Sequence, residues 1–248
     1  MRSRTKGAWV LVTGFALLAS SLPGIAQERK GGTQPPAVDS GAKATPSAAV
    51  PVYKPPPRGA PGGRVGGGTR GTPGRDTFTL SVLAPDANGL TVSEQPSLYW
   101  FISADISLPV EVTIADPNGT QPLLEKRVPT PVKRGVQRFP LADHGVKLAP
   151  GIPYRWSVTV VSDPNRRSRD ILASGTIERV EPPAGLGAKL QGASKTNLAF
   201  LYADAGIWYD ALAAISELIE SSPNDAELLR QREALLTQAG LPEVARDR

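Results

Sequence analysis

The sequence of 248 residues contains no cysteine and a single histidine. Without cysteine the chain has no residue for lipid acylation, no disulfide framework, no thiolate nucleophile and no cysteine-based metal site. A zinc site normally draws on several histidine or cysteine ligands, so one histidine argues against it. No Gly-x-Ser-x-Gly motif presents a serine nucleophile either. We therefore interpret His144 as a solvated turn residue, and we expect no catalytic residue, no metal site and no cofactor.

Long apolar runs are missing except near the N-terminus. Residues 2–6 include three basic side chains, residues 8–18 are largely apolar, and Gly24-Ile25-Ala26 has the small-x-small form of a cleavage site. A membrane anchor needs about 20 apolar residues, and two serines and a proline interrupt the run at 20–23. We predict a signal peptide at residues 1–26, with an uncleaved anchor as the alternative. The mature protein is then periplasmic or extracellular, with no stable membrane span.

Positive charge is scarce in the part of the chain that can fold. The formal net charge is +5, but residues 76–248 carry only 17 basic residues against 21 acidic ones. A nucleic-acid-binding module requires a basic face on its folded part. We therefore expect no nucleic-acid partner, and export of the protein argues in the same direction.

Large apolar side chains are almost absent from residues 27–75, which are rich in proline, glycine, alanine and serine. Such a segment buries too little surface to offset the entropy lost on ordering, so we predict a disordered linker. Its basic residues are spaced singly. This spacing leaves two interpretations open, a solvated spacer or an electrostatic tether to an anionic envelope polymer or lipid surface.

A helical period is absent from residues 76–182, which instead alternate apolar and polar side chains between turn signals. The alternation predicts seven short strands, at residues 77–83, 97–103, 109–115, 123–128, 136–141, 154–161 and 171–180. Such a series is typical of an antiparallel β-sandwich. A buried tryptophan at Trp100 and a Leu-x-Pro-Gly-x-x-Tyr turn ending at Tyr154, which is typical of a tyrosine corner, favour the immunoglobulin or fibronectin type III kind.

The alternation also assigns the few aromatic side chains to faces. Tyr154 and Trp156 share one face of their strand, and we predict that both are buried and structural. Tyr99 and Phe101 flank Trp100 and point away from the sandwich core. Two adjacent outward aromatic side chains are rarely left bare. Another part of the chain covers them, or they are possible binding residues for a partner.

After residue 182 the apolar period changes from 2 to 3.6 residues. We predict a helical segment at residues 194–241, similar to a tetratricopeptide-like hairpin or a three-helix segment, so the fold is mainly β with a helical C-terminus. One such repeat cannot bury its own apolar face. We expect it to dock on the sandwich over Tyr99 and Phe101, and a peptide-binding groove that stays open is the alternative. Capping and solvation account for Asp204 and Asp210, which flank the turn between two of these helices.

Arginine is concentrated in one loop of the predicted sandwich, at residues 163–170. Arg166, Arg167 and Arg169 lie between two strands, at a pole where sandwich domains often bind ligands. Guanidinium groups bind carboxylate or phosphate groups in a bidentate manner, so these arginines form a possible binding site for an anionic glycan or peptide. The alternative is a structural loop in which Asp163 and Asp170 pair with Arg167 and its neighbours.

Five short motifs carry a family resemblance: Gly89-Leu90-Thr91-Val92-Ser93, Gly151-Ile152-Pro153-Tyr154-Arg155-Trp156, Pro164-Asn165-x-Arg167-Ser168-x-Asp170, Glu178-Arg179-Val180 and Tyr202-Ala203-x-Ala205-Gly206-Ile207-Trp208-Tyr209-Asp210-Ala211-Leu212. Together they resemble the cyanobacterial domain of unknown function 928 family over residues 79–241. Ser162 stands where many members have cysteine, which argues against a thiol-dependent role. The resemblance implies an envelope protein with a sandwich and a helical end, and it brings no activity, substrate or catalytic residue.

Three functions remain open after these observations. The first is an exported, non-catalytic interaction or scaffold module of the cell envelope, whose partner is an envelope protein or an anionic envelope polymer. The second is a binding domain for an anionic glycan or peptide that uses the arginine loop. The third is a hydrolase of envelope polysaccharide, which requires two carboxylates about 5–10 Å apart in a deep pocket.

Overall fold

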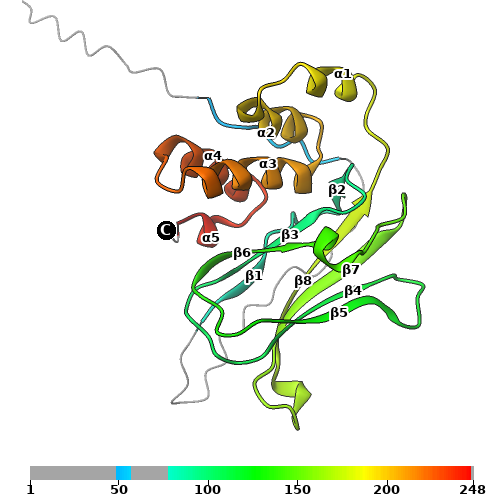
Figure 1. Cartoon of the computed structure of the whole chain (residues 1–248), viewed down its shortest axis with the longest axis vertical. Helices are drawn as coiled ribbons and strands as arrows, with labels where there is room; N and C mark the ends of the chain where they lie inside the picture. Colours follow the sequence, from blue (N-terminus) through cyan, green and yellow to red (C-terminus); the bar gives the residue numbers. More distant parts are fainter. Residues whose placement is uncertain (1–48, 57–77, 247–248) are drawn as a thin grey trace, which may run out of the picture. The chain divides into compact units, whose positions relative to one another are not determined.

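A computed structural model of the chain describes residues 49–56 and 78–246 (Figure 1). The predicted signal peptide lies outside these residues, and so does the predicted linker except for residues 49–56. Eight β-strands come first along the described residues, and five α-helices follow them. The protein is therefore rich in β-structure with a helical C-terminal part, as the alternation and the change of period predict.

The strands form two sheets in a sandwich-like arrangement. The first sheet has three antiparallel strands in the order β1-β3-β6, with β1 at Leu80–Val82, β3 at Ser97–Ile102 and β6 at Gly135–Pro140. The second has five strands in the order β2-β8-β7-β4-β5, with β2 at Gly89–Thr91, β8 at Ile171–Arg179, β7 at Pro153–Val160, β4 at Val110–Ala115 and β5 at Pro122–Val128.

One strand pair departs from the predicted antiparallel sandwich. Strand β2 runs parallel to β8, with Gly89 beside Ile177. The chain leaves the first sheet after β1 and enters the second at β2, and Pro85 lies in this connection, where it cannot donate a ladder hydrogen bond. The second sheet is therefore mixed. Strand β2 was not predicted, because its three residues are too few for an alternating pattern and they follow a turn signal.

Strand β7 contributes one of its faces to the sandwich core. Tyr154, Trp156, Val158 and Val160 are all buried, which confirms the prediction for the two aromatic residues. The Tyr154 hydroxyl accepts a hydrogen bond from the backbone N–H of Ala149 at 3.3 Å. This bond ties the start of β7 to the turn before it, as the sequence motif predicts.

Strand β3 is buried on both of its faces. Leu98, Trp100 and Ile102 belong to the core on one face, whereas Tyr99 and Phe101 on the other face are only 1% and 3% exposed. A helix of the same chain, α3, packs against β3. Of the two sequence interpretations, coverage by the chain itself is therefore the one that the structure supports.

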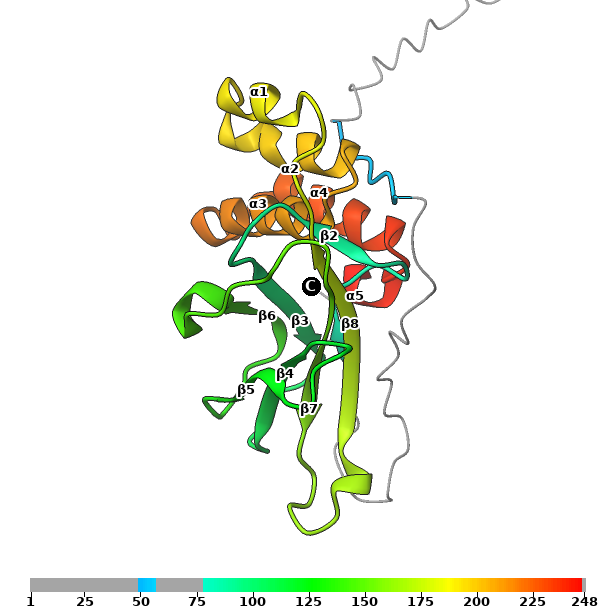
Figure 2. The same ribbon diagram turned by 90° about the vertical axis from the view of Figure 1, so that its right-hand side faces the viewer.

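The helices are more numerous than the predicted hairpin or three-helix segment. They are α1 at Leu186–Gln191, α2 at Lys195–Asp204, α3 at Trp208–Ser221, α4 at Ala226–Gln238 and α5 at Pro242–Arg246. Helices α1 and α5 extend beyond the predicted bounds, and Val244 in α5 is buried. Helix α3 contacts β2 and β3 (Figure 2). Among the described residues, no helix combines the length and hydrophobicity that a membrane-spanning segment requires.

The prediction of a disordered linker is wrong for residues 49–56. We call residues 51–56 the strap, because they lie along the helices. The Lys54 N–H donates to the Ala203 carbonyl at 3.1 Å, and the Tyr53 N–H donates to the Gln238 side chain at 2.7 Å. Tyr53 itself is 6% exposed. The composition of the whole linker hid this short run, in which an aromatic side chain provides buried surface and the prolines lower the entropy lost on ordering.

Candidate functional site

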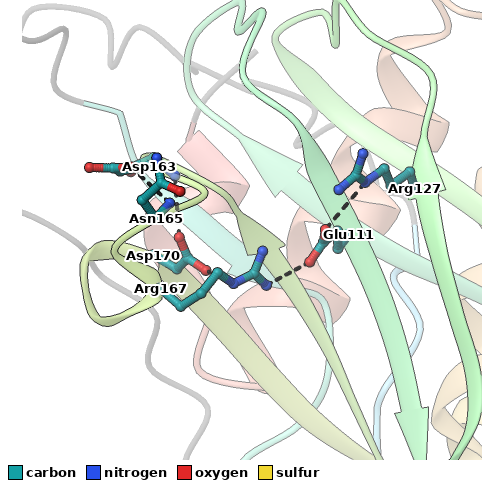
Figure 3. Close-up of polar contacts among 7 residues, drawn as sticks. Glu111, Arg127, Asp163, Asn165, Arg167 and Asp170 are labelled. Atoms are coloured by element: carbon teal, nitrogen blue, oxygen red, sulfur yellow. Dashed lines mark hydrogen bonds and ion pairs between the residues drawn. The ribbon is translucent and has the colours of Figure 1, made fainter.

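The arginine loop contains an internal ion-pair cluster, drawn in Figure 3. Arg167 donates to the Glu111 carboxylate at 2.6 Å and pairs with Asp170 at 2.8 Å. Arg127 contacts the same Glu111 carboxylate at 3.3 Å. The Arg167 guanidinium is the main cause that holds the pKa of Glu111 below its usual value. Arg167 is therefore held by two carboxylates of its own chain.

The remaining residues of this loop form a turn. The Asp163 carboxylate accepts from the backbone N–H of Asn165 at 3.0 Å, and Asp170 accepts from the N–H of Ser162 at 3.3 Å. Arg166 and Arg169 are exposed. The structure thus brings Arg167 and Asp170 together, as the structural alternative expects, whereas Asp163 bonds to backbone. Of the three arginines in this loop, Arg166 and Arg169 stay accessible to a ligand.

The other two possible binding residues are not accessible. Tyr99 and Phe101 lie beneath other parts of the chain, and burial raises the pKa of Tyr99 to about 12. Their role is to fill the space under the helices. His144 is exposed at the end of a short 3₁₀ helix, and its ring stacks on Phe139 with 4.4 Å between centroids. Within residues 49–56 and 78–246, no group of three or more His, Cys, Asp or Glu side chains could hold a metal ion.

Two side chains on the first turn of α3, Trp208 and Tyr209, form buried hydrogen bonds with both sheets. The Tyr209 hydroxyl accepts a hydrogen bond from the Trp156 indole at 2.8 Å and donates one to the Thr176 carbonyl at 2.9 Å. The Trp208 indole donates to the Leu83 carbonyl at 2.8 Å. Trp156, Trp208 and Tyr209 are all fully buried. We call this set of contacts the joint, because it fixes the start of α3 to both sheets.

A glycine makes room for the joint. A Cβ atom at Gly89 would lie 2.5 Å from Cε2 of Tyr209 and 3.2 Å from the Thr176 carbonyl oxygen. No side chain fits in that space, because real Cβ contacts are never this short. The first residue of β2 therefore has to be glycine for the Tyr209 ring to reach its two hydrogen-bond partners.

Asp210 completes the joint, and the sequence analysis misjudged it as a capping or solvated residue. Its carboxylate accepts from the Thr91 hydroxyl at 2.7 Å and from the Val92 N–H at 3.2 Å. Burial raises the pKa of Asp210 to about 6, although both hydrogen bonds oppose this shift. Sequence alone held no signal for this contact, because an acidic residue in the first turn of a helix is already explained by the helix dipole. Asp204, by contrast, is exposed and pairs with Lys54.

A groove of about 490 Å³ opens beside Asp210. It is bounded by the loop between β2 and β3, by β6 and the 3₁₀ helix after it, and by α2 and α3. Its main polar lining residues are Gln95, Arg138, Asp143, Tyr202, Asp210 and Glu217. Pockets that bind small ligands commonly measure about 300–1,000 Å³ and combine apolar walls with a few polar groups.

The charge of this groove is set by its acids. Arg138 contacts Glu220 at 3.2 Å, Glu217 at 3.6 Å and the Ser97 hydroxyl at 3.2 Å, so its guanidinium is occupied. Asp143 and Asp210 remain as acidic lining residues. Since an unpaired carboxylate repels an anion and attracts hydroxyl, amide or ammonium donors, the groove suits a neutral polar or cationic group.

The two hydrogen bonds of the Tyr209 hydroxyl should contribute measurably to the free energy of unfolding. We expect Tyr209→Phe to lower the free energy of unfolding by about 2 kcal/mol, because the Trp156 indole N–H and the Thr176 carbonyl lose a partner while buried. Tyr202→Phe is the matched control, since this half-buried tyrosine lies at the groove, and we expect a change within about 0.5 kcal/mol. Urea unfolding measures both. Equal losses in the two variants would contradict the joint.

Asp210 gives the stability a defined pH dependence. Its pKa is raised from 3.8 in the unfolded chain to about 6 in the folded one, so its contribution is fully present below about pH 4 and is lost as pH rises through 6. We expect Asp210→Asn to remove this loss, which amounts to about 2–3 kcal/mol. The control Asp204→Asn keeps it. An unchanged slope of stability between pH 4 and 6 in Asp210→Asn would show that the carboxyl is not desolvated.

Comparison with known protein families agrees with the resemblance that the five short sequence motifs indicate. The domain of unknown function family DUF928 matches residues 65–248, which include all eight strands, all five helices and the joint. No curated protein matches the chain. Because the match spans well over half of its length, the chain belongs to the DUF928 family.

Proposed function

We propose that the protein is an exported, non-catalytic interaction or scaffold module of the cell envelope, and that the groove beside Asp210 is its binding surface. The observation that carries this proposal is the position of the groove. Both the sheet layer and the helical layer line the groove. Tyr209 and Asp210, which hold these layers together in the joint, are themselves lining residues of the groove. A preformed wall lowers the ordering cost of binding.

The cellular location is part of the same proposal. Residues 1–26 have the three regions of a signal peptide, and this supports a periplasmic or extracellular module. The resemblance to a family of cyanobacterial proteins supports a cyanobacterial envelope as the setting. An envelope protein or polymer is then the partner that such a module meets.

A non-catalytic role is supported by how the reactive side chains are used. The Tyr209 hydroxyl and the Asp210 carboxylate both hold α3 to the sheets. The Tyr209 hydroxyl both accepts and donates a structural hydrogen bond, so it has little capacity left for proton transfer to a substrate. The groove thus offers recognition by shape and hydrogen bonding.

Binding of an anionic glycan or peptide by the arginine loop is the second candidate. The exposed side chains of Arg166 and Arg169 favour it, since both lie at the pole of the sandwich beyond β7. Arg167 is not part of this candidate site, because Glu111 and Asp170 hold it.

Hydrolysis of envelope polysaccharide is the third candidate. A pKa of about 6 at Asp210 is suited to a general acid, and Asp143 and Glu217 line the same groove. Glycan cleavage that disappears in Asp210→Asn would favour this candidate over the first.

We also propose that the sandwich is of the immunoglobulin or fibronectin type III kind and that the helices are tetratricopeptide-like. The neighbours β1-β3-β6 and β4-β7-β8 follow the order A-B-E and C-F-G of immunoglobulin domains, and the Tyr154 bond to Ala149 supports a tyrosine corner. Successive contacts of α2 with α3 and of α3 with α4 support the tetratricopeptide-like interpretation.

Capture from envelope extract tests the groove against the arginine loop. The bait is the mature chain, and Ala214→Arg fills the groove from α3 without touching a joint contact. We expect Ala214→Arg to abolish capture of the bound protein or polymer and Arg166→Ala combined with Arg169→Ala to retain it. The reverse pattern would favour the second candidate. Capture that both variants retain in full would contradict the groove, provided that thermal unfolding shows each variant folded.

A further inference from the structure

The strap is held by an aromatic contact at its centre. The Tyr53 ring packs edge-on against Trp208, with 5.0 Å between centroids and 65° between ring planes. Tyr53 is 6% exposed, and burial raises its pKa to about 12. Its hydroxyl has no hydrogen-bond partner among the residues that the structure describes. The surroundings of this side chain therefore contact the aromatic ring and do not bind its hydroxyl group.

Hydrogen bonds to the strap backbone fix its register. Gln238 uses both ends of its side-chain amide, because its oxygen accepts from the Tyr53 N–H at 2.7 Å and its nitrogen donates to the Pro51 carbonyl at 2.9 Å. The Ala203 carbonyl, in the last turn of α2, accepts from the Lys54 N–H at 3.1 Å. The same carbonyl also accepts from the Gly206 N–H at 3.0 Å, so the strap supplies its second donor.

Lys54 makes two further contacts, one through its backbone carbonyl and one through its side chain. A Cβ atom at Gly206 would lie 2.7 Å from the Lys54 carbonyl oxygen, so the glycine after α2 lets the strap backbone pass. The Lys54 ammonium pairs with the Asp204 carboxylate. We call Ala203, Asp204, Gly206, Trp208 and Gln238 the strap seat.

We propose that the strap seat is a recognition site for an extended, proline-flanked peptide with an aromatic residue followed by lysine, and that it accepts this segment from a second copy of the chain. The seat combines an aromatic contact, backbone hydrogen bonds and one charge pair, which is how grooves that bind extended proline-rich peptides achieve both affinity and specificity. This proposal does not rest on the groove beside Asp210, because the two sites share no residue of the seat.

A second copy is the occupant that the chain itself supplies. The segment that fits the seat is residues 51–56 of the same sequence, so every copy carries both the ligand and the site. The 21 residues 57–77 join the strap to Phe78 just before β1, and a chain of this length spans at most about 70 Å. That reach is enough for an adjacent protein, and exchange of an identical element is a low-cost route to association.

Competition within one copy sets the conditions for exchange. A segment tethered to its own site acts at an effective concentration on the order of 1 mM. Dilute copies therefore keep their own straps, and exchange requires either crowding or a copy whose strap is weakened. This condition determines the design of the test.

The first test uses the full chain with Tyr53→Ala as receptor, and as probe a labelled peptide with the sequence of residues 49–58. We expect saturable binding by fluorescence anisotropy, and binding to the unsubstituted chain at least about tenfold weaker because its own strap competes. A peptide with Phe for the tyrosine should bind at least as tightly, since the buried hydroxyl has no partner. A peptide with Ala there should lose about 30-fold or more.

Seat variants assign this binding to the predicted contacts. Adding Gln238→Ala to the receptor removes two hydrogen bonds and should weaken binding about tenfold. Thr237→Ala, the neighbouring exposed residue, is the matched control and should leave binding unchanged. If Tyr53→Ala fails to fold, Lys54→Glu serves as receptor, because it places a carboxylate against Asp204 and weakens the strap without removing the ring.

The second test asks whether whole copies exchange straps. Tyr53→Ala supplies an open seat, and Gln238→Ala with Asp204→Lys supplies an intact strap on a damaged seat. We expect sedimentation to show association in the mixture and not in either protein alone. No saturation of a folded receptor up to about 1 mM peptide, or binding indifferent to Gln238→Ala, would overturn the site. Peptide binding without association of the mixed copies would overturn the second copy as occupant.

Discussion

The Tyr209 hydroxyl is the contact on which the arrangement of the two layers depends. It accepts from Trp156 in β7 and donates to Thr176 in β8, so one buried oxygen connects α3 to the centre of the larger sheet. Its neighbours extend this role, because Trp208 reaches the end of β1 and Asp210 reaches β2. Three consecutive side chains thus fix the first turn of α3 to four different strands or their ends, and the positions of the groove and the strap seat follow from that turn.

Charge in this protein is used mainly to hold structure together. The Arg167 guanidinium forms ion pairs with Glu111 and Asp170, and Arg138 contacts Glu217 and Glu220. The exposed pairs among these contribute little each, so their importance lies in orienting loops. Asp143 is an acidic lining residue of the groove, and burial raises the pKa of Asp210, which also lines it, to about 6. These features are the reason for assigning recognition of a neutral or cationic polar group to the groove.

Sequence reasoning was reliable where local pattern decides structure. Alternation placed Trp156 in the core, and the change of period located the helical segment that contains α3. It failed where contacts between distant segments decide. The three residues of β2 are too few for a pattern, and the strap is ordered only because Trp208 and Gln238, more than 150 residues away, receive it. The burial of Tyr99 is an exception, because its outward position on β3 and the unpaired apolar face of the helices together predicted that the helices cover it.

We expect the sandwich and the helices to unfold as one cooperative body, because the joint connects them. Native-state hydrogen exchange of backbone amides tests it most directly, because exchange reports the free energy of opening for each element separately. The slowest amides of α3 and of β7 should exchange with the same opening free energy, equal to that of global unfolding. Exchange of the α3 amides through a separate opening several kcal/mol below that of β7 would contradict it.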